Sequence, residues 1–220
     1  EVKALKIPMG APGFKHEALI RKYGGTLLSS NYALYGDMSR RVMDVLGRFS
    51  PELEIYSIDE AFLGLNGFRI RDLEAYGRKI RDTVRRWTGI PVSVGISRSK
   101  TLAKVANHYA KRYSGYRGCV LMLDEARIQK ALERLPVAEI WGIGRQYDKF
   151  LRQNKIENAW QLRNAPEQFI DHYMTSVGHK TVLELQGFSC INMDEAPSPK
   201  QSIVVSRSFG KQVSDLAELE

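Results

Sequence analysis

Asp59 and Glu60, two adjacent carboxylates within an apolar stretch, constrain the fold more than any other feature of the sequence. Residues 53–58 alternate in the manner of a strand, and Ala61-Phe62-Leu63 is apolar again. This pattern predicts two short strands joined by a tight turn that carries the carboxylates. Two hard oxygen donors beside a buried sheet suit Mg²⁺ or Mn²⁺, which also accept water and phosphate oxygens as ligands. A solvated hairpin turn is the alternative, because Asp is common in turns.

The balance of charge points to a polyanionic partner. The chain has 33 Lys and Arg against 25 Asp and Glu, a formal net charge of +8. Such a surface favours nucleic acid first and a membrane surface second. With 220 residues, of which 43% are hydrophobic, the chain can bury a sizeable core as one large or two small domains.

Cysteine content and hydropathy point to the cytoplasm. Cys119 and Cys190 are far apart and in no Cys-x-x-Cys spacing, which indicates neither a zinc site nor a disulfide framework. No apolar run approaches the roughly 20 residues that span a bilayer, and the N-terminus shows no signal-peptide pattern. We therefore expect a cytoplasmic protein without a membrane partner. Because the chain begins with Glu1 rather than Met, we also expect it to be a piece of a longer protein.

Periodicity along residues 1–135 predicts an α+β fold. Expected elements are a short helix over 14–23, a brief strand at 26–28, long helices over 29–50 and 69–87, and strands at 92–97 and 119–123. Ser30 or Asn31 caps the first long helix, Ser97 or Ser99 the helix after the third strand pattern, and Asp124 the helix after the last. This order implies a sheet with helices on one face. The second long helix has a strongly basic outer face, which attracts DNA or is simply solvated.

The junction Ser97-Arg98-Ser99-Lys100 offers hydroxyls, cations and backbone N–H groups at a helix N-terminus. That combination predicts a phosphate-binding cradle. Lys104 and Lys111 follow on the same helix, about two turns apart and near one face.

Short helices alone are expected after Pro136, which marks the start of a second domain. Residues 137–156 predict a helix-hairpin-helix around Gly142-Ile143-Gly144-Arg145. The two glycines permit a tight turn whose amides point outward, a geometry that grips a DNA phosphate without reading bases. An ordinary glycine turn between helices is the alternative. Residues 188–201 predict a linker, and 202–209 predict the first strand of a further domain.

Several motifs together resemble the Y-family translesion DNA polymerases. They are Tyr56-Ser57-Ile58-Asp59-Glu60-Ala61-Phe62, Val94-Gly95-Ile96-Ser97 with Lys100-Thr101-Leu102-Ala103-Lys104-Val105-Ala106-Asn107, and Trp141-Gly142-Ile143-Gly144. Residues 29–39 further resemble the UmuC subgroup, which contains the catalytic subunit of bacterial DNA polymerase V. The likeness covers essentially the whole chain. It implies partial fingers over 1–50, a palm over 51–135, a thumb over 136–187, a linker over 188–201 and the start of a little finger over 202–220.

The implied fold is α+β, with a palm-type antiparallel or mixed sheet, helices on one face, and a small all-α helix-hairpin-helix thumb. By the same resemblance Asp59 and Glu60 are the catalytic carboxylates, which bind two Mg²⁺ ions, and Ser57 lies near the primer end. Lys3, Lys104 and Lys111 face the incoming nucleotide, held apart from the metals on other elements. Residues that bind the DNA backbone are Ser57, Gly142, Ile143, Gly144 and Arg145.

The resemblance implies error-prone, template-directed DNA synthesis past lesions in the SOS response, by two-metal nucleotidyl transfer. Primer-template DNA and deoxynucleotides are the implied substrates, and a UmuD′-like dimer and RecA the implied partners. A further metal-binding Asp and a steric-gate residue of the family are expected before Glu1, and Lys6-Ile7-Pro8 replaces the family's Gly-Val-Lys. We therefore expect the parent protein to be the enzyme and this chain alone to be inactive. A non-catalytic DNA-binding or adaptor fragment is the alternative.

Overall fold

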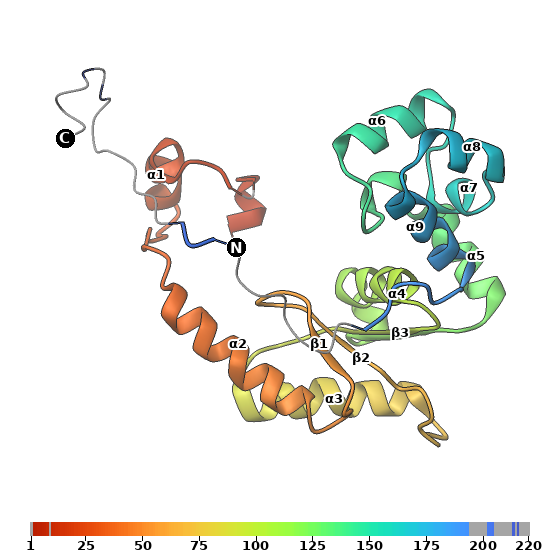
Figure 1. The fold of residues 1–220 in the computed structure, drawn as a ribbon. Coiled ribbons are helices and arrows are strands. Elements are labelled where there is room, and N and C mark those ends of the chain that lie inside the picture. The colour runs from red at the N-terminus through yellow and green to blue at the C-terminus, as the bar shows by residue number, and fades with distance from the viewer. Residues whose placement is uncertain (1, 9, 194–201, 205–212, 214, 216–220) are drawn as a thin grey trace.

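A computed structural model describes residues 2–8, 10–193, 202–204, 213 and 215 (Figure 1). The first part of the chain contains η1 (Val2–Leu5), α1 (Gly13–Lys22), α2 (Tyr32–Leu46), β1 (Leu53–Ile55), β2 (Ala61–Leu63), α3 (Leu73–Thr88), β3 (Val94–Ser97), α4 (Lys100–Arg112), η2 (Ser114–Tyr116), β4 (Cys119–Met122) and α5 (Glu125–Arg134). Short helices follow: η3 (Val137–Glu139), α6 (Arg145–Gln153), α7 (Ala159–Arg163), α8 (Glu167–Tyr173) and α9 (Ser176–Gln186). The predicted α+β class is confirmed.

The strands of the described residues form two pairs rather than one continuous sheet. β1 and β2 are antiparallel, with Glu54 opposite Phe62, and form the predicted hairpin. β3 and β4 are parallel, with Val94 opposite Cys119 and Ser97 opposite Met122. Antiparallel and parallel pairing both occur, but in two separate two-stranded sheets, and each pair depends on helices to cover it.

Helices cover both faces of the β3–β4 pair. A side chain added at Gly77 of α3 would meet Val94 and Ile96, whereas one added at Gly95 would meet the backbone of Ala103 and Asn107 in α4. Because neighbouring strand residues point to opposite faces, α3 and α4 lie on opposite sides. Figure 1 shows the same arrangement, with α3 below the strands and α4 above them. The finer expectation that the helices lie on one face is therefore corrected: Gly95 leaves room for a second helix to approach the strand.

Three helices begin after the capping residues that the sequence predicts, and one begins later than predicted. Asn31, Ser99 and Asp124 each accept a backbone N–H from three residues further on, as predicted. The second long helix begins at Leu73, after the cap Asp72, and not at residue 69. Residues 26–28 and 202–204 form no strand, and residues 205–209 of the predicted last strand lie outside the described residues.

One apolar core continues from the sheet into the short helices. It runs from Leu102 and Val105 of α4 through Ile128 and Leu132 of α5 to Leu185 of α9. A smaller core joins α2 and α3 around Val45, Ile80 and Val84. In place of the first helix of the predicted helix-hairpin-helix there is only the three-residue η3. No helix in the described part of the chain is long and apolar enough to cross a membrane.

Candidate functional site

Asp59 and Glu60 lie in the turn between β1 and β2, as the sequence predicts. The backbone N–H groups of Tyr56 and Ser57 both donate to the Glu60 carbonyl oxygen, at 3.1 and 3.0 Å. The Ser57 hydroxyl donates to the Asp59 carboxylate at 2.8 Å. Asp59 is exposed and Glu60 is half-buried. These bonds hold the two carboxylates in a closed, ordered turn.

Glu60 is held by a lysine from another element. The Lys104 ammonium of α4 donates to both Glu60 carboxylate oxygens, at 2.8 and 2.9 Å. The side chains are 22% exposed for Lys104 and 38% exposed for Glu60. The expectation that Lys104 is kept apart from the metal-binding carboxylates is therefore wrong for Glu60, because α4 packs its second turn directly beside the hairpin.

An aromatic cluster surrounds this ion pair. The Lys104 ammonium lies 5.3 Å from the ring centre of Tyr56 and 5.6 Å from that of Trp141, distances typical of cation–π contacts. The Trp141 indole N–H donates to the Tyr56 hydroxyl at 3.0 Å. Phe62 packs against both rings. Sequence reasoning gave Trp141 no role, although its place immediately before Gly142 is a signal that could have drawn attention to it.

Lys100, one turn earlier on α4, forms a second and deeper ion pair. Its ammonium donates to the Glu54 carboxylate, and both side chains are buried, at 7% and 8% exposure. The same ammonium donates to the Asn192 carbonyl oxygen at 2.6 Å and lies 5.1 Å from the ring centre of Phe62. Lys100 thus faces protein groups and not solvent.

The predicted phosphate cradle at the start of α4 is filled by the protein itself. Glu184 of α9 is fully buried, and its carboxylate accepts the backbone N–H groups of Thr101, Cys190 and Ile191 at 2.9 to 3.1 Å. The Ser97 and Ser99 hydroxyls donate to the carbonyls of Met122 and Glu184. The prediction of a phosphate site at residues 97–100 is therefore wrong, because an internal carboxylate satisfies the positive end of this helix.

Two further lysines, Lys111 and Lys3, were predicted to bind the nucleotide. Lys111 is exposed in the last turn of α4 and makes no hydrogen bond or ion pair with the described residues. Lys3 lies in η1, but its side chain lies outside the described part.

The glycine turn before α6 has the conformation that requires glycine. Gly142 has φ of +89°, and a side chain there would also approach the Thr181 hydroxyl to 3.1 Å. Ile143 is buried, Gly144 is the N-cap of α6 without a side-chain cap, and Arg145 is exposed. The first backbone N–H groups of a helix have no partner within the helix. The Ile143 N–H donates to the Ile140 carbonyl oxygen at 3.0 Å, so it is not free for a phosphate. Gly144 and Arg145 are exposed at the start of α6, and contact of this turn with a phosphate stays a prediction.

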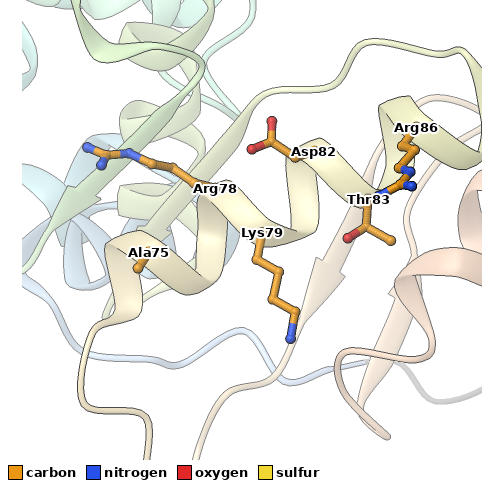
Figure 2. Close-up of a pocket in the computed structure, with 6 residues that line it drawn as sticks. All are labelled: Ala75, Arg78, Lys79, Asp82, Thr83 and Arg86. Atoms are coloured by element: carbon orange, nitrogen blue, oxygen red, sulfur yellow. The ribbon is translucent and has the colours of Figure 1, made fainter.

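The basic face of α3 does not form a convergent site. A shallow pocket is lined by Ala75, Arg78, Lys79, Asp82, Thr83 and Arg86, and Figure 2 shows their basic side chains pointing in different directions. Arg78 pairs with Glu74, and Arg81 with Asp82 at 2.6 Å. Part of the charge is therefore neutralised locally.

The donor chemistry of the hairpin turn fits Mg²⁺. Asp59 and Glu60 supply hard carboxylate oxygens, and Asp59 is open to solvent. Among the described residues, no three His, Cys, Asp or Glu side chains lie close enough to hold a metal ion. An ion at this pair would retain several waters, since Mg²⁺ takes six ligands.

Both cysteines are free thiols. Burial, followed by the negative charge of Glu74, raises the pKa of the Cys119 thiol, and burial and Glu184 raise that of Cys190. A raised pKa disfavours the thiolate, so neither is activated for nucleophilic chemistry.

Comparison of the sequence with a family model and with curated proteins gives matches of the same kind. The sequence model of the impB/mucB/samB family matches residues 1–108. The chain is 43% identical to Protein UmuC of Salmonella typhimurium over 221 aligned residues, and 40% identical to Protein MucB of Escherichia coli over 219. These alignments cover 100% and 99% of the chain and 52% of each relative, so the chain spans about half the length of the curated relatives it matches.

A more distant sequence relative and a solved structure also match the chain. DNA polymerase IV of Pelotomaculum thermopropionicum is 29% identical over 97% of the chain and 51% of that protein. The crystal structure of DinB from Sulfolobus solfataricus aligns with a TM-score of 0.69 and 21% identity, covering 88% of this chain and 56% of that one. The structural match shows a shared fold.

Proposed function

Residues 1–108 match the sequence model of the impB/mucB/samB family, and from that match we propose that the chain is part of an error-prone, translesion DNA polymerase of the UmuC kind. The identity of 40 to 43% to UmuC and MucB along nearly the whole chain supports this function, as does the name of the DNA polymerase IV relative. The single observation that carries it is the ordered hairpin turn with Asp59 and Glu60. The substrates are primer-template DNA and deoxynucleoside triphosphates, and the setting is the cytoplasmic SOS response.

In this function Asp59 and Glu60 would hold Mg²⁺, which activates the primer hydroxyl and neutralises charge on the transferred phosphoryl group. Ser57 fixes Asp59 through its hydroxyl and so sets the direction of one carboxylate. Lys111, exposed on α4, and Lys3 are the cations assigned to the triphosphate. Lys104 was also predicted to bind the nucleotide, but its ammonium donates to the Glu60 carboxylate. We therefore assign its contact to Glu60 and not to the triphosphate.

The turn of Gly142, Ile143, Gly144 and Arg145 would bind the DNA backbone. The first backbone N–H groups of α6 and the exposed Arg145 cation can contact phosphate oxygens without reading base edges, which suits an enzyme that must accept any sequence, whereas buried Ile143 would support the turn from within. A UmuD′-like dimer and RecA are the partners that the UmuC relationship suggests.

Primer extension by the product of the complete reading frame tests this function. The unaltered protein should extend a primer with Mg²⁺ and four deoxynucleotides, and Asp59→Ala should reduce the rate by about a thousandfold or more, since misplaced metals cost orders of magnitude. The 220 residues alone should give no measurable extension, because their hairpin turn brings together only two of the carboxylates needed to fix two ions. Normal extension by the Asp59→Ala protein would refute the proposal.

DNA binding by the 220 residues provides a separate test. Fluorescence anisotropy across a salt series should show sequence-independent binding that weakens with salt, by a log–log slope of about −0.9 per phosphate contact. The double change Gly142→Asp and Gly144→Asp should weaken binding and flatten the slope. The matched control Glu139→Asp keeps the charge next to the turn. An unchanged slope in the glycine variant would remove the turn from the DNA interface, and DNA binding without extension by the complete protein would favour the non-catalytic alternative.

A further inference from the structure

Three elements meet at the Lys104 ammonium: the β1–β2 hairpin, α4 and the loop before α6. It bonds to both oxygens of Glu60 and faces the rings of Tyr56 and Trp141. Trp141 in turn bonds to the Tyr56 hydroxyl. Trp141 is also the residue directly before Gly142, the first glycine of the proposed DNA-binding turn. A short chain of contacts therefore connects a proposed metal ligand to that turn.

The ion pair occupies the oxygens that a divalent ion would use. Both Glu60 carboxylate oxygens accept from one ammonium, and although each oxygen keeps a second lone pair, an ion bound there would lie beside that ammonium. Repulsion between the two cations therefore favours displacement of the ammonium. Partly exposed Lys–Glu pairs are weak, so this exchange has a small cost. The exposure of both side chains lets water and ions reach the pair.

We propose that Lys104 is a positioning residue that holds Glu60 until a divalent ion replaces its ammonium, and that this replacement is transmitted to Trp141 and the glycine turn. The inference rests on the proposed function, because the ion is the one assigned to Glu60. Coupling of this kind is reciprocal: if the ion shifts Trp141, then whatever shifts Trp141 changes the affinity for the ion.

Binding of Mn²⁺ alone to the 220-residue chain tests the first half. The free-Mn²⁺ signal in electron paramagnetic resonance gives the affinity for the unaltered chain, Lys104→Met, Lys104→Arg and Lys130→Met. Lys130 is an exposed lysine of α5 and so a control for loss of one positive charge. Lys104→Met should bind Mn²⁺ about three- to tenfold more tightly, because a competing cation is gone. Lys104→Arg and Lys130→Met should stay within about twofold of the unaltered chain.

The indole N–H signal of Trp141 in two-dimensional NMR tests the second half. Three tryptophans give three indole signals, and Trp141→Phe identifies the one that matters. Mg²⁺, which is diamagnetic, should move the Trp141 signal in the unaltered chain and leave those of Trp87 and Trp160 in place. In Lys104→Met the signal should start at a new position, and Mg²⁺ should move it by less than half as much. A lysine with a purely structural role would not produce this difference.

The outcomes separate this inference from the proposed function. If Glu60→Gln and Asp59→Ala leave Mn²⁺ affinity unchanged, the hairpin is not the metal site and the proposed function loses its chemistry. If those variants lose Mn²⁺ but Lys104→Met binds no tighter, or Trp141 responds to Mg²⁺ equally in that variant, the role of Lys104 is refuted. Circular dichroism checks that each variant is folded, and Lys104→Gln gives the same test should Lys104→Met misfold.

Discussion

Two lysines of α4, one helical turn apart, pair with two glutamates of the same hairpin, and the two pairs have different surroundings. Lys100 and Glu54 are buried, and the Lys100 ammonium has a further carbonyl and an aromatic ring around it. Lys104 and Glu60 are partly exposed at the hairpin turn. The two pairs differ in burial and not in residue type, and from that difference we expect the inner pair to fix the fold and the outer pair to stay accessible to solvent.

The physical reason is the cost of leaving a charge without a partner. In the inner pair, neither water nor a metal ion can replace a lost partner, so removing one charge strands the other in a medium of low polarity. In the outer pair, water takes over at once. The inner pair thus anchors the hairpin against α4, and the outer pair can take part in binding.

Loss of the inner lysine should have the largest effect on stability. Lys100→Met removes the buried cation of the Lys100–Glu54 pair, and we expect the free energy of unfolding to fall by about 3–5 kcal/mol, the range for breaking a buried ion pair. Urea unfolding followed by circular dichroism measures this value. The double variant Lys100→Met with Glu54→Gln should recover part of the loss, because no buried carboxylate charge then remains at residue 54. A loss below about 1 kcal/mol would show that the inner pair is no anchor.

An intermediate effect is expected at Glu184, which accepts the backbone N–H of Thr101 in the same first turn of α4. Glu184→Gln removes the charge that three backbone N–H groups share, while the amide oxygen still accepts hydrogen bonds. We expect a loss of about 1–3 kcal/mol in the free energy of unfolding, the range for weakened bonds to a buried charged group. Glu133→Gln on the exposed side of α5 is the control and should change little. Equal stability of the two variants would mean that this carboxylate contributes nothing to holding α9 against α4.

The smallest effect is expected at the outer pair. Lys104→Met should lower the free energy of unfolding by less than about 1 kcal/mol, the value of a partly exposed ion pair. Added salt should reduce even this difference, since exposed charges are screened. Urea titrations at low and high ionic strength measure it. A destabilisation as large as that of Lys100→Met would abolish the distinction between the two pairs.

Interactions between residues that are close in the sequence could be predicted from the sequence. The hairpin turn at Asp59 and Glu60, the caps Asn31, Ser99 and Asp124, and the glycine requirement at Gly142 all follow from residues within a few positions. Their physical causes are local: strand alternation, side-chain acceptors for the first helix amides, and a positive φ. These elements lie where the sequence predicts them.

Contacts between segments that are distant in the sequence could not be predicted from the sequence. The start of α4 has the composition of a phosphate cradle, yet the carboxylate that fills it comes from Glu184, 83 residues after Thr101. The helices on both faces of β3–β4 likewise depend on how closely α4 approaches Gly95. Neither partner can be identified from local pattern, because hydrophobic periodicity shows which face is buried but not what covers it.

Local sequence therefore determined the two carboxylates, their turn and the helix that carries both lysines. Only the tertiary structure decided that Lys100 is enclosed while Lys104 stays within reach of solvent, because residues as distant as Phe62, Glu184 and Asn192 close around the first turn of α4. The two lysines are identical in type and four positions apart, so no local rule separates them. What separates them is the number of protein atoms packed around each charge, which arises only when the chain folds.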